Sequence, residues 1–159
     1  MKFRIGLGID VHQLSKDRDL FLGGIKIASE KGCIAHSDGD VLLHAICDAL
    51  LGAANLRDIG FHFPDNSDEF KNIDSKILLS RTCNLLYSKG YKIENIDSTV
   101  CLEKPKIKDY IPEMIKTIAK VINISEDCIS IKATTTEKLG FTGREEGVVA
   151  LAVVSISKE

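Results

Sequence analysis

The segment from 41 to 54 constrains the fold most, because it combines a helical pattern with very little charge. Its charged or basic side chains are His44 and Asp48. The apolar residues recur at the 3.6-residue spacing of a helix and are Leu42, Ala45, Ile46, Ala49, Leu50 and Ala53. We therefore predict a buried helix here, with an N-cap supplied by the polar stretch at 37–40.

Segments with the pattern of strands alternate with helical segments along the rest of the chain. Strands are predicted at 3–9, 91–102, 128–134 and 147–157, with a hairpin over 20–27 that turns at Gly23 and Gly24. Two further helices are predicted at 74–89 and 108–123. The alternation predicts an α/β (α+β sandwich) fold, in which residues 1–159 form a single domain with helices on one face of a mixed β-sheet.

Composition limits the partners and the compartment of the protein. The 159 residues include 21 basic and 23 acidic side chains, and no dense basic cluster predicts a nucleic-acid or membrane partner. The five cysteines include no C-x-x-C pair, which argues against a disulfide framework and a thiolate zinc site. The N-terminus lacks the pattern of a signal peptide. We therefore expect a cytoplasmic protein.

Three residues have the composition of a metal site. Asp10 and His12 are two positions apart at the end of a predicted strand, so their side chains point to the same face. His44 lies on the predicted helix at 41–54. One carboxylate and two imidazoles are the ligand set of a catalytic zinc site, in which the fourth position is open. Alternatively, His12 is a surface residue at the end of a strand and His44 is a core histidine with a hydrogen-bond partner.

The segment 132–144 has the residue types of a phosphate site. Its consecutive hydroxyls can donate to phosphate oxygens, and Arg144 can pair with one of them. Glu137 can hold a divalent cation that bridges two phosphates. The alternative is an ordinary strand rich in β-branched residues that ends in a solvated acid.

Two loops have weaker signals. The turn at 102–107 contains Lys104, Pro105 and Lys106, and its lysines could line a polyphosphate or base pocket. The alternative is a charged turn that leads into a helix. Residues 58–65 follow the predicted metal-bearing helix, at a position where a ligand-binding loop is expected.

Taken together, five strings resemble the 2-C-methyl-D-erythritol 2,4-cyclodiphosphate synthase family. They occur in the order of that family and span nearly the whole chain. The strings are R-I-G-L-G-I-D-V-H at 4–12, A-H-S-D-G-D-V-L-L-H-A at 35–45, D-I-G-F-H-F-P-D at 58–65, P-K-I at 105–107 and K-A-T-T-T-E-K-L-G-F-T-G-R at 132–144.

The resemblance implies a role for each matching residue. It implies that Asp10, His12 and His44 bind zinc and that His36 and Thr135 are catalytic. It implies that Ser37, Asp58, Ile59, Gly60, Phe63, Pro64 and Asp65 bind the methylerythritol phosphate end of the substrate, that Lys104, Pro105 and Lys106 bind cytidine and phosphate, and that Thr134, Thr136, Glu137, Phe141 and Arg144 bind the diphosphate. Glu137 would also reach a second ion, Mg²⁺ or Mn²⁺.

The resemblance also implies a reaction and an assembly. The substrate would be 4-diphosphocytidyl-2-C-methyl-D-erythritol 2-phosphate, which a lyase of the non-mevalonate isoprenoid pathway converts to the cyclodiphosphate and CMP. The family is homotrimeric, with active sites between neighbouring subunits. Two other interpretations stay open: a zinc-dependent phosphohydrolase, and a non-catalytic module that binds a nucleotide or an isoprenoid diphosphate.

Overall fold

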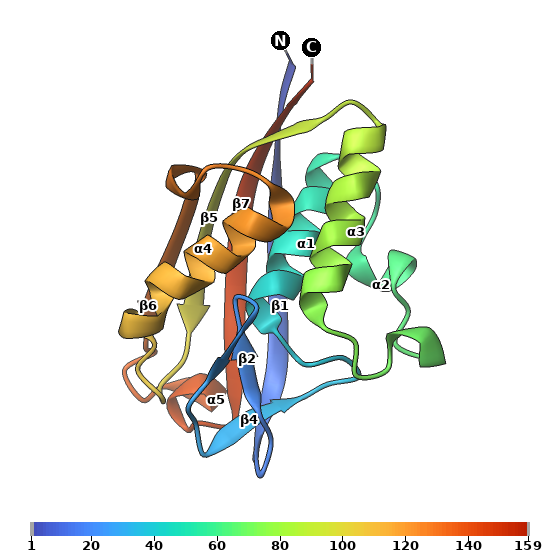
Figure 1. Cartoon of the computed structure of the whole chain (residues 1–159). Helices are drawn as coiled ribbons and strands as arrows, with labels where there is room; N and C mark the ends of the chain where they lie inside the picture. Colours follow the sequence, from blue (N-terminus) through green and yellow to red (C-terminus); the bar gives the residue numbers. More distant parts are fainter. Residues whose placement is uncertain (1, 159) are drawn as a thin grey trace.

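A five-stranded mixed sheet forms the centre of the structure, a computed structural model that describes residues 2–158 (Figure 1). The strands are β1 (Lys2–Lys16), β2 (Leu20–Leu22), β3 (Ile25–Ile27), β4 (Lys31–Ile34), β5 (Lys92–Cys101), β6 (Ile129–Thr134) and β7 (Gly147–Lys158). The helices are α1 (Val41–Ala53), α2 (Ile59–His62), α3 (Ser75–Ser88), α4 (Ile111–Ile122) and α5 (Gly140–Gly143), with 3₁₀ turns η1 (Asp68–Phe70), η2 (Lys108–Tyr110) and η3 (Glu126–Cys128).

The sheet has the strand order β4-β1-β7-β5-β6. β5 and β6 run parallel, whereas the other neighbouring strands are antiparallel, so the predicted mixed sheet is confirmed. The longest pairing joins β1 to β7, from Lys2 opposite Lys158 to Gln13 opposite Gly147. The predicted strand at 3–9 was too short, because β7 and then β4 continue to pair with β1 as far as Lys16.

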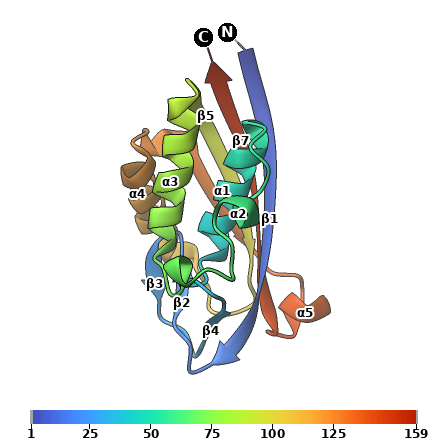
Figure 2. The same cartoon turned by 90° about the vertical axis from the view of Figure 1, so that its right-hand side faces the viewer.

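Helices α1, α3 and α4 lie on one face of the sheet, as predicted, whereas the short α5 projects on the other side (Figure 2). Their buried residues join those of the sheet in one hydrophobic core. The predicted helices at 41–54 and 74–89 are confirmed as α1 and α3. The one at 108–123 begins as the 3₁₀ turn η2 before it becomes α4. None of the helices in the described chain is long and apolar enough to cross a membrane.

Three short elements have no clear signal in the sequence. β4, α2 and α5 have four residues each, which is too short for a period to be recognised. They exist because of contacts with distant parts of the chain. β4, for example, pairs with the end of β1, where Gln13 lies opposite Ile34.

Helix α1 packs directly on the backbone of β1 through two glycines. A Cβ atom at Gly6 would lie 1.9 Å from the carbonyl oxygen of Ala49, and one at Gly8 would lie 2.0 Å from that of Ala45. Real Cβ atoms do not approach a backbone oxygen so closely, so any side chain at these positions would push the helix away from the strand. The glycines therefore set the distance between β1 and α1.

A buried carboxylate fixes the start of α1. Asp40 caps the helix by accepting a hydrogen bond from the Leu43 amide, 3.0 Å away. It also accepts from the amides of Gly23, at 3.0 Å, and Gly24, at 2.6 Å, in the hairpin between β2 and β3. Burial raises the pKa of the Asp40 carboxyl, although these amides oppose the shift. The cap places His44 one turn into the helix.

The face of β1 that points away from α1 is apolar and exposed. Its side chains alternate with the glycines along the strand and are Phe3, Ile5, Leu7, Ile9 and Val11. Ile5 is 74% exposed and Leu7 is 60% exposed, on the part of β1 that pairs with β7 before β4 joins the sheet at Gln13. This surface, which we call the open face, has the character of an unpaired interface.

We predict that Gly8→Ala lowers the free energy of unfolding by about 1–3 kcal/mol or more, because the new methyl group meets the Ala45 carbonyl. Gly52→Ala is the matched control, since Gly52 lies in α1 with no atom within 4 Å of an added Cβ. That change should stabilise the protein by about 0.5–1 kcal/mol through helix propensity. Chemical denaturation measures both. Equal effects of the two substitutions would contradict the proposed contact.

Candidate metal centre and substrate cleft

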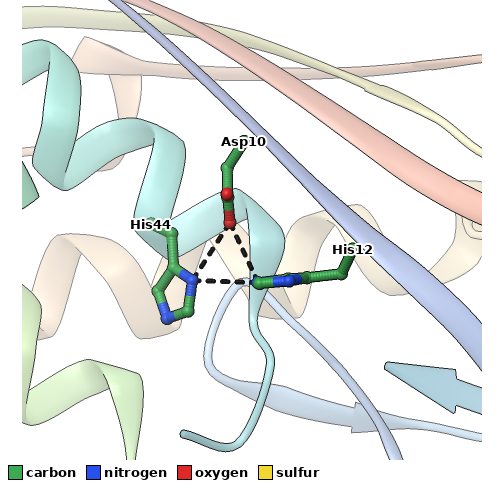
Figure 3. Close-up of side chains that lie close together, drawn as sticks. All are labelled: Asp10, His12 and His44. Atoms are coloured by element: carbon green, nitrogen blue, oxygen red, sulfur yellow. Dashed lines mark hydrogen bonds and ion pairs between the residues drawn. The ribbon is translucent and has the colours of Figure 1, made fainter. Parts of the chain in front are cut away.

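Three side chains from two packed elements converge on one point. Asp10 and His12 extend from β1, and His44 extends from the first turn of α1 (Figure 3). Asp10 Oδ2 lies 3.0 Å from His12 Nε2 and 3.0 Å from His44 Nδ1, and the two ring nitrogens lie 3.1 Å apart. The prediction that Asp10 and His12 share one face of the strand is confirmed.

The spacing of these atoms fits a single metal ion. Nitrogen and oxygen ligands lie about 2.0–2.2 Å from a tetrahedral zinc, so they lie roughly 3.3–3.5 Å from one another. The measured triangle of 3.0–3.1 Å is within a few tenths of an ångström of that spacing. Within residues 2–158, one group of possible metal ligands has its ligand atoms this close together, and it consists of Asp10, His12 and His44. They could hold one ion and leave its outer side open.

The two imidazoles keep the carboxylate ionised. Burial raises the pKa of the Asp10 carboxyl, but hydrogen bonds and charge from His12 and His44 outweigh that effect and hold the pKa well below its usual range. A metal ligand must be deprotonated, and Asp10 is therefore ready to bind at neutral pH.

The metal group borders a cleft of about 440 Å³. Nine of the predicted residues line it and are Asp10, His12, His36, Ser37, His44, Ile59, Gly60, Phe63 and Asp65. His36 is held in place by a hydrogen bond between its Nε2 and the Ser67 carbonyl, 2.9 Å away. The cleft therefore joins the predicted metal residues to most of the predicted methylerythritol phosphate residues.

Two carboxylates fix the loop after α1, one from the helix and one from the loop itself. Asp48 Oδ1 accepts from the Ile59 amide at 3.1 Å, and Asp58 Oδ1 accepts from the Phe61 amide at 3.0 Å. Burial raises the pKa of the Asp48 carboxyl. Asp58 therefore caps α2, and neither it nor Pro64 is part of the cleft lining.

The predicted base and phosphate residues lie elsewhere on the same chain. Pro105, Lys106, Thr134 and Thr135 line a second hollow of about 330 Å³, which shares no lining residue with the cleft beside the metal group. Lys104 is exposed and pairs with the Glu145 carboxylate at 3.1 Å. In a single copy of the chain, the predicted site residues therefore line two different hollows, which we call the two halves of the site.

Side chains beyond β6 are paired with each other in the single chain. The Thr135 hydroxyl donates to Glu137 Oε1 at 3.1 Å. The Thr136 hydroxyl instead donates to the Leu139 carbonyl at 2.7 Å, so it holds the turn together.

The end of this segment is exposed. The Arg144 guanidinium makes two hydrogen bonds of 3.0 Å to the Glu146 carboxylate, which raises the pKa of Arg144. Phe141 is 41% exposed. Both side chains can therefore reach a ligand or a second subunit.

The sequence patterns missed several residues of the cleft. Its apolar wall is formed by Ala35, Phe70, Ile73 and Leu78, which have no signal other than hydrophobicity. Beneath His44, Ser75 Oγ lies 2.9 Å from His44 Nε2 and donates to Asp38. The sequence gives Ser75 only the signal of a residue near a helix start.

Comparison with known proteins identifies the family. A model of the YgbB family matches residues 3–157. The chain belongs to this family. Among its curated YgbB-type relatives is the 2-C-methyl-D-erythritol 2,4-cyclodiphosphate synthase of Bacteroides fragilis, which is 63% identical over 158 residues and covers 99% of each chain.

Solved structures agree with the family assignment. The bifunctional IspDF from Campylobacter jejuni superposes with a TM-score of 0.96 at 43% identity, over 99% of this chain and 43% of that longer protein. The IspF of Plasmodium falciparum, in a CDP complex, superposes with a TM-score of 0.86 at 38% identity and covers 99% of this chain and 97% of that one.

We predict that Asp10→Asn weakens Zn²⁺ binding by at least about a hundredfold, because it removes the charged ligand of the group. His62→Ala is the control, since the His62 ring bonds the Leu56 carbonyl and lies outside the metal group. Competition with a chromophoric chelator measures affinity, and circular dichroism checks folding. A folded Asp10→Asn protein with wild-type affinity would rule out this metal centre.

Proposed function

We propose that this chain is a lyase that converts 4-diphosphocytidyl-2-C-methyl-D-erythritol 2-phosphate to 2-C-methyl-D-erythritol 2,4-cyclodiphosphate and CMP. This reaction belongs to non-mevalonate isoprenoid biosynthesis. The observation that carries the proposal is the triangle of Asp10, His12 and His44, open to a cleft that also contains His36. The curated relatives with this activity in their names match the chain over its full length.

The reaction is an intramolecular phosphoryl transfer. An oxygen of the 2-phosphate forms a bond to the β-phosphorus, and the bond between the β-phosphorus and the oxygen of the α-phosphate breaks. The released group is CMP. The nucleophile is already an anion, so the step needs alignment and charge neutralisation more than it needs a general base.

The metal centre would neutralise charge on the reacting phosphates. A zinc ion held by Asp10, His12 and His44 would supply a Lewis acid for a phosphate oxygen. The side chains around it orient the substrate. His36 and Ser37 border the same cleft, and we assign His36 a catalytic role beside the reacting phosphates.

The loop after α1 would bind the methylerythritol end. Gly60 and Phe63 line the cleft, and the Asp48 and Asp58 hydrogen bonds fix the backbone around them. The hydroxyls of methylerythritol need donors and acceptors at fixed positions. Asp58 and Asp65 provide carboxylate acceptors, and Ile59 and Pro64 complete the loop.

The second half of the site would bind the diphosphate and the cytidine. Lys104, Lys106 and Arg144 supply positive charge. Thr135 is assigned a catalytic role as a hydrogen-bond donor to a phosphate oxygen. Glu137 could hold a second ion, Mg²⁺ or Mn²⁺, between the phosphates. The remaining contacts in this half are assigned to Pro105, Thr134, Thr136 and Phe141.

The two halves would meet between neighbouring copies in a homotrimer. The cleft and the second hollow share no lining residue, and β7 and β5 lie between β1 and β6 in the sheet, which supports a substrate bound by the metal half of one copy and the β6 half of the next. Two different surfaces that pair head to tail form a closed ring when the rotation between neighbouring copies is a whole fraction of a turn, and a rotation of one third gives a trimer. The open face of β1 offers an apolar surface that such a ring would bury.

The proposed function also concerns the domain organisation and the cellular location of the protein. We propose that residues 1–159 form one synthase domain that works in the cytoplasm. The five cysteines support that location, since the described ones are free thiols and three of them are buried.

Phosphorus NMR of the purified protein with the proposed substrate, Zn²⁺ and Mg²⁺ tests the reaction directly. We predict the appearance of CMP together with a cyclic diphosphate, and loss of turnover when a chelator removes the metal. Release of inorganic phosphate would instead support a phosphohydrolase. An unchanged spectrum from folded, zinc-loaded protein would support a non-catalytic binding module.

A further inference from the structure

A buried hydroxyl lies directly behind the metal ligand His44. Ser75, the first residue of α3, has no exposed surface, and its Oγ lies 2.9 Å from His44 Nε2. This nitrogen is on the side of the ring opposite Nδ1, which faces Asp10 and His12. Ser75 thus contacts the ligand without reaching the metal position itself.

The direction of the hydrogen bonds follows from the single proton of a hydroxyl. Ser75 Oγ donates that proton to the carboxylate of Asp38. It can therefore only accept at His44, so His44 Nε2 must carry the proton of the ring. When the ring is neutral, as it must be to bind a metal, the other nitrogen, Nδ1, then has a free lone pair. That lone pair points at the metal position.

We propose that Ser75 and Asp38 are positioning residues for metal binding, which select the tautomer and the ring orientation that make His44 Nδ1 a ligand. The inference rests on the metal centre proposed above and deepens it. Hydrogen bonds to the second nitrogen of a histidine ligand are known to orient the ring and to raise its basicity. In this protein the Asp38 carboxylate acts on His44 through the Ser75 hydroxyl and not by direct contact.

Asp38 is itself fixed at several atoms. Its Oδ2 accepts from the Ser75 amide at 2.9 Å, its Oδ1 accepts from the Asp40 amide at 3.1 Å, and its own amide donates to the Ile73 carbonyl at 3.1 Å. These bonds join the turn before α1 to the start of α3. The carboxylate is therefore held rigidly enough to orient the Ser75 hydroxyl.

A second hydroxyl near His44 is less suited to this role. Ser37 Oγ lies 3.2 Å from His44 Nε2, which is longer than the 2.9 Å of Ser75. It also accepts from the Gly39 amide and is half-buried at the edge of the cleft. Ser75 is fully enclosed and has a carboxylate behind it, so it controls the proton of the ring.

The test measures Zn²⁺ affinity by chelator competition for the wild type, Ser75→Ala and Asp38→Asn. We expect Ser75→Ala to bind Zn²⁺ about 10–100-fold more weakly than the wild type. Asp38→Asn leaves the Ser75 hydroxyl in place, and it should also weaken Zn²⁺ binding. Ser75→Thr, which retains a hydroxyl, should recover most of the affinity. Ser98→Ala is the matched control, because Ser98 is also buried and its hydroxyl donates to the Ser130 carbonyl, outside the metal group.

A spectroscopic measurement separates positioning from general destabilisation. In a nitrogen-15 NMR spectrum of the zinc-loaded wild type, the His44 Nε2 proton should exchange slowly with water, and Ser75→Ala should accelerate that exchange. If folded Ser75→Ala binds Zn²⁺ within about twofold of the wild type, the positioning role is overturned while the metal centre stands. If the wild type itself binds no Zn²⁺, the proposed metal centre fails, and this inference fails with it.

Discussion

The close packing of α1 on β1 is the contact on which the rest of the site depends. Gly6 and Gly8 leave room for the helix backbone to lie against the strand. Two and four residues beyond Gly8 on the strand, Asp10 and His12 reach the first turn of that helix and meet His44. If the helix stood further away, the three ligand atoms could not lie within one coordination sphere. The packing of α1 on β1 therefore also brings the three possible metal ligands together.

A layer of polar contacts surrounds this centre and ties it to the other elements. Asp40 attaches α1 to the β2–β3 hairpin, Asp38 attaches the preceding turn to α3, and Asp48 holds the loop that leads to α2. Each carboxylate accepts backbone amides that would otherwise be left without partners. These hydrogen bonds therefore connect the segments that surround the cleft to one another.

The sequence predicted the parts of the site that depend on periodicity. A two-residue spacing on a strand placed Asp10 and His12 on one face, and helical spacing identified the buried helix of His44. Ser75 could not be predicted, because its contact with His44 arises from the packing of α3 on α1, 31 residues away along the chain. Nor could the sequence show that Thr135 lies in a separate hollow from the metal group, since the sheet order places β7 and β5 between β1 and β6.

The proposed sharing of one active site between two copies of the chain is tested most directly by a mixing experiment. One variant carries Asp10→Asn, and the other carries Thr135→Ala together with Glu137→Gln, so each lacks a different half. Co-expressed chains in a ring with shared sites should recover about one quarter of wild-type activity, because about one interface in four combines two intact halves. Mixed assemblies no more active than the separate variants would contradict the shared site.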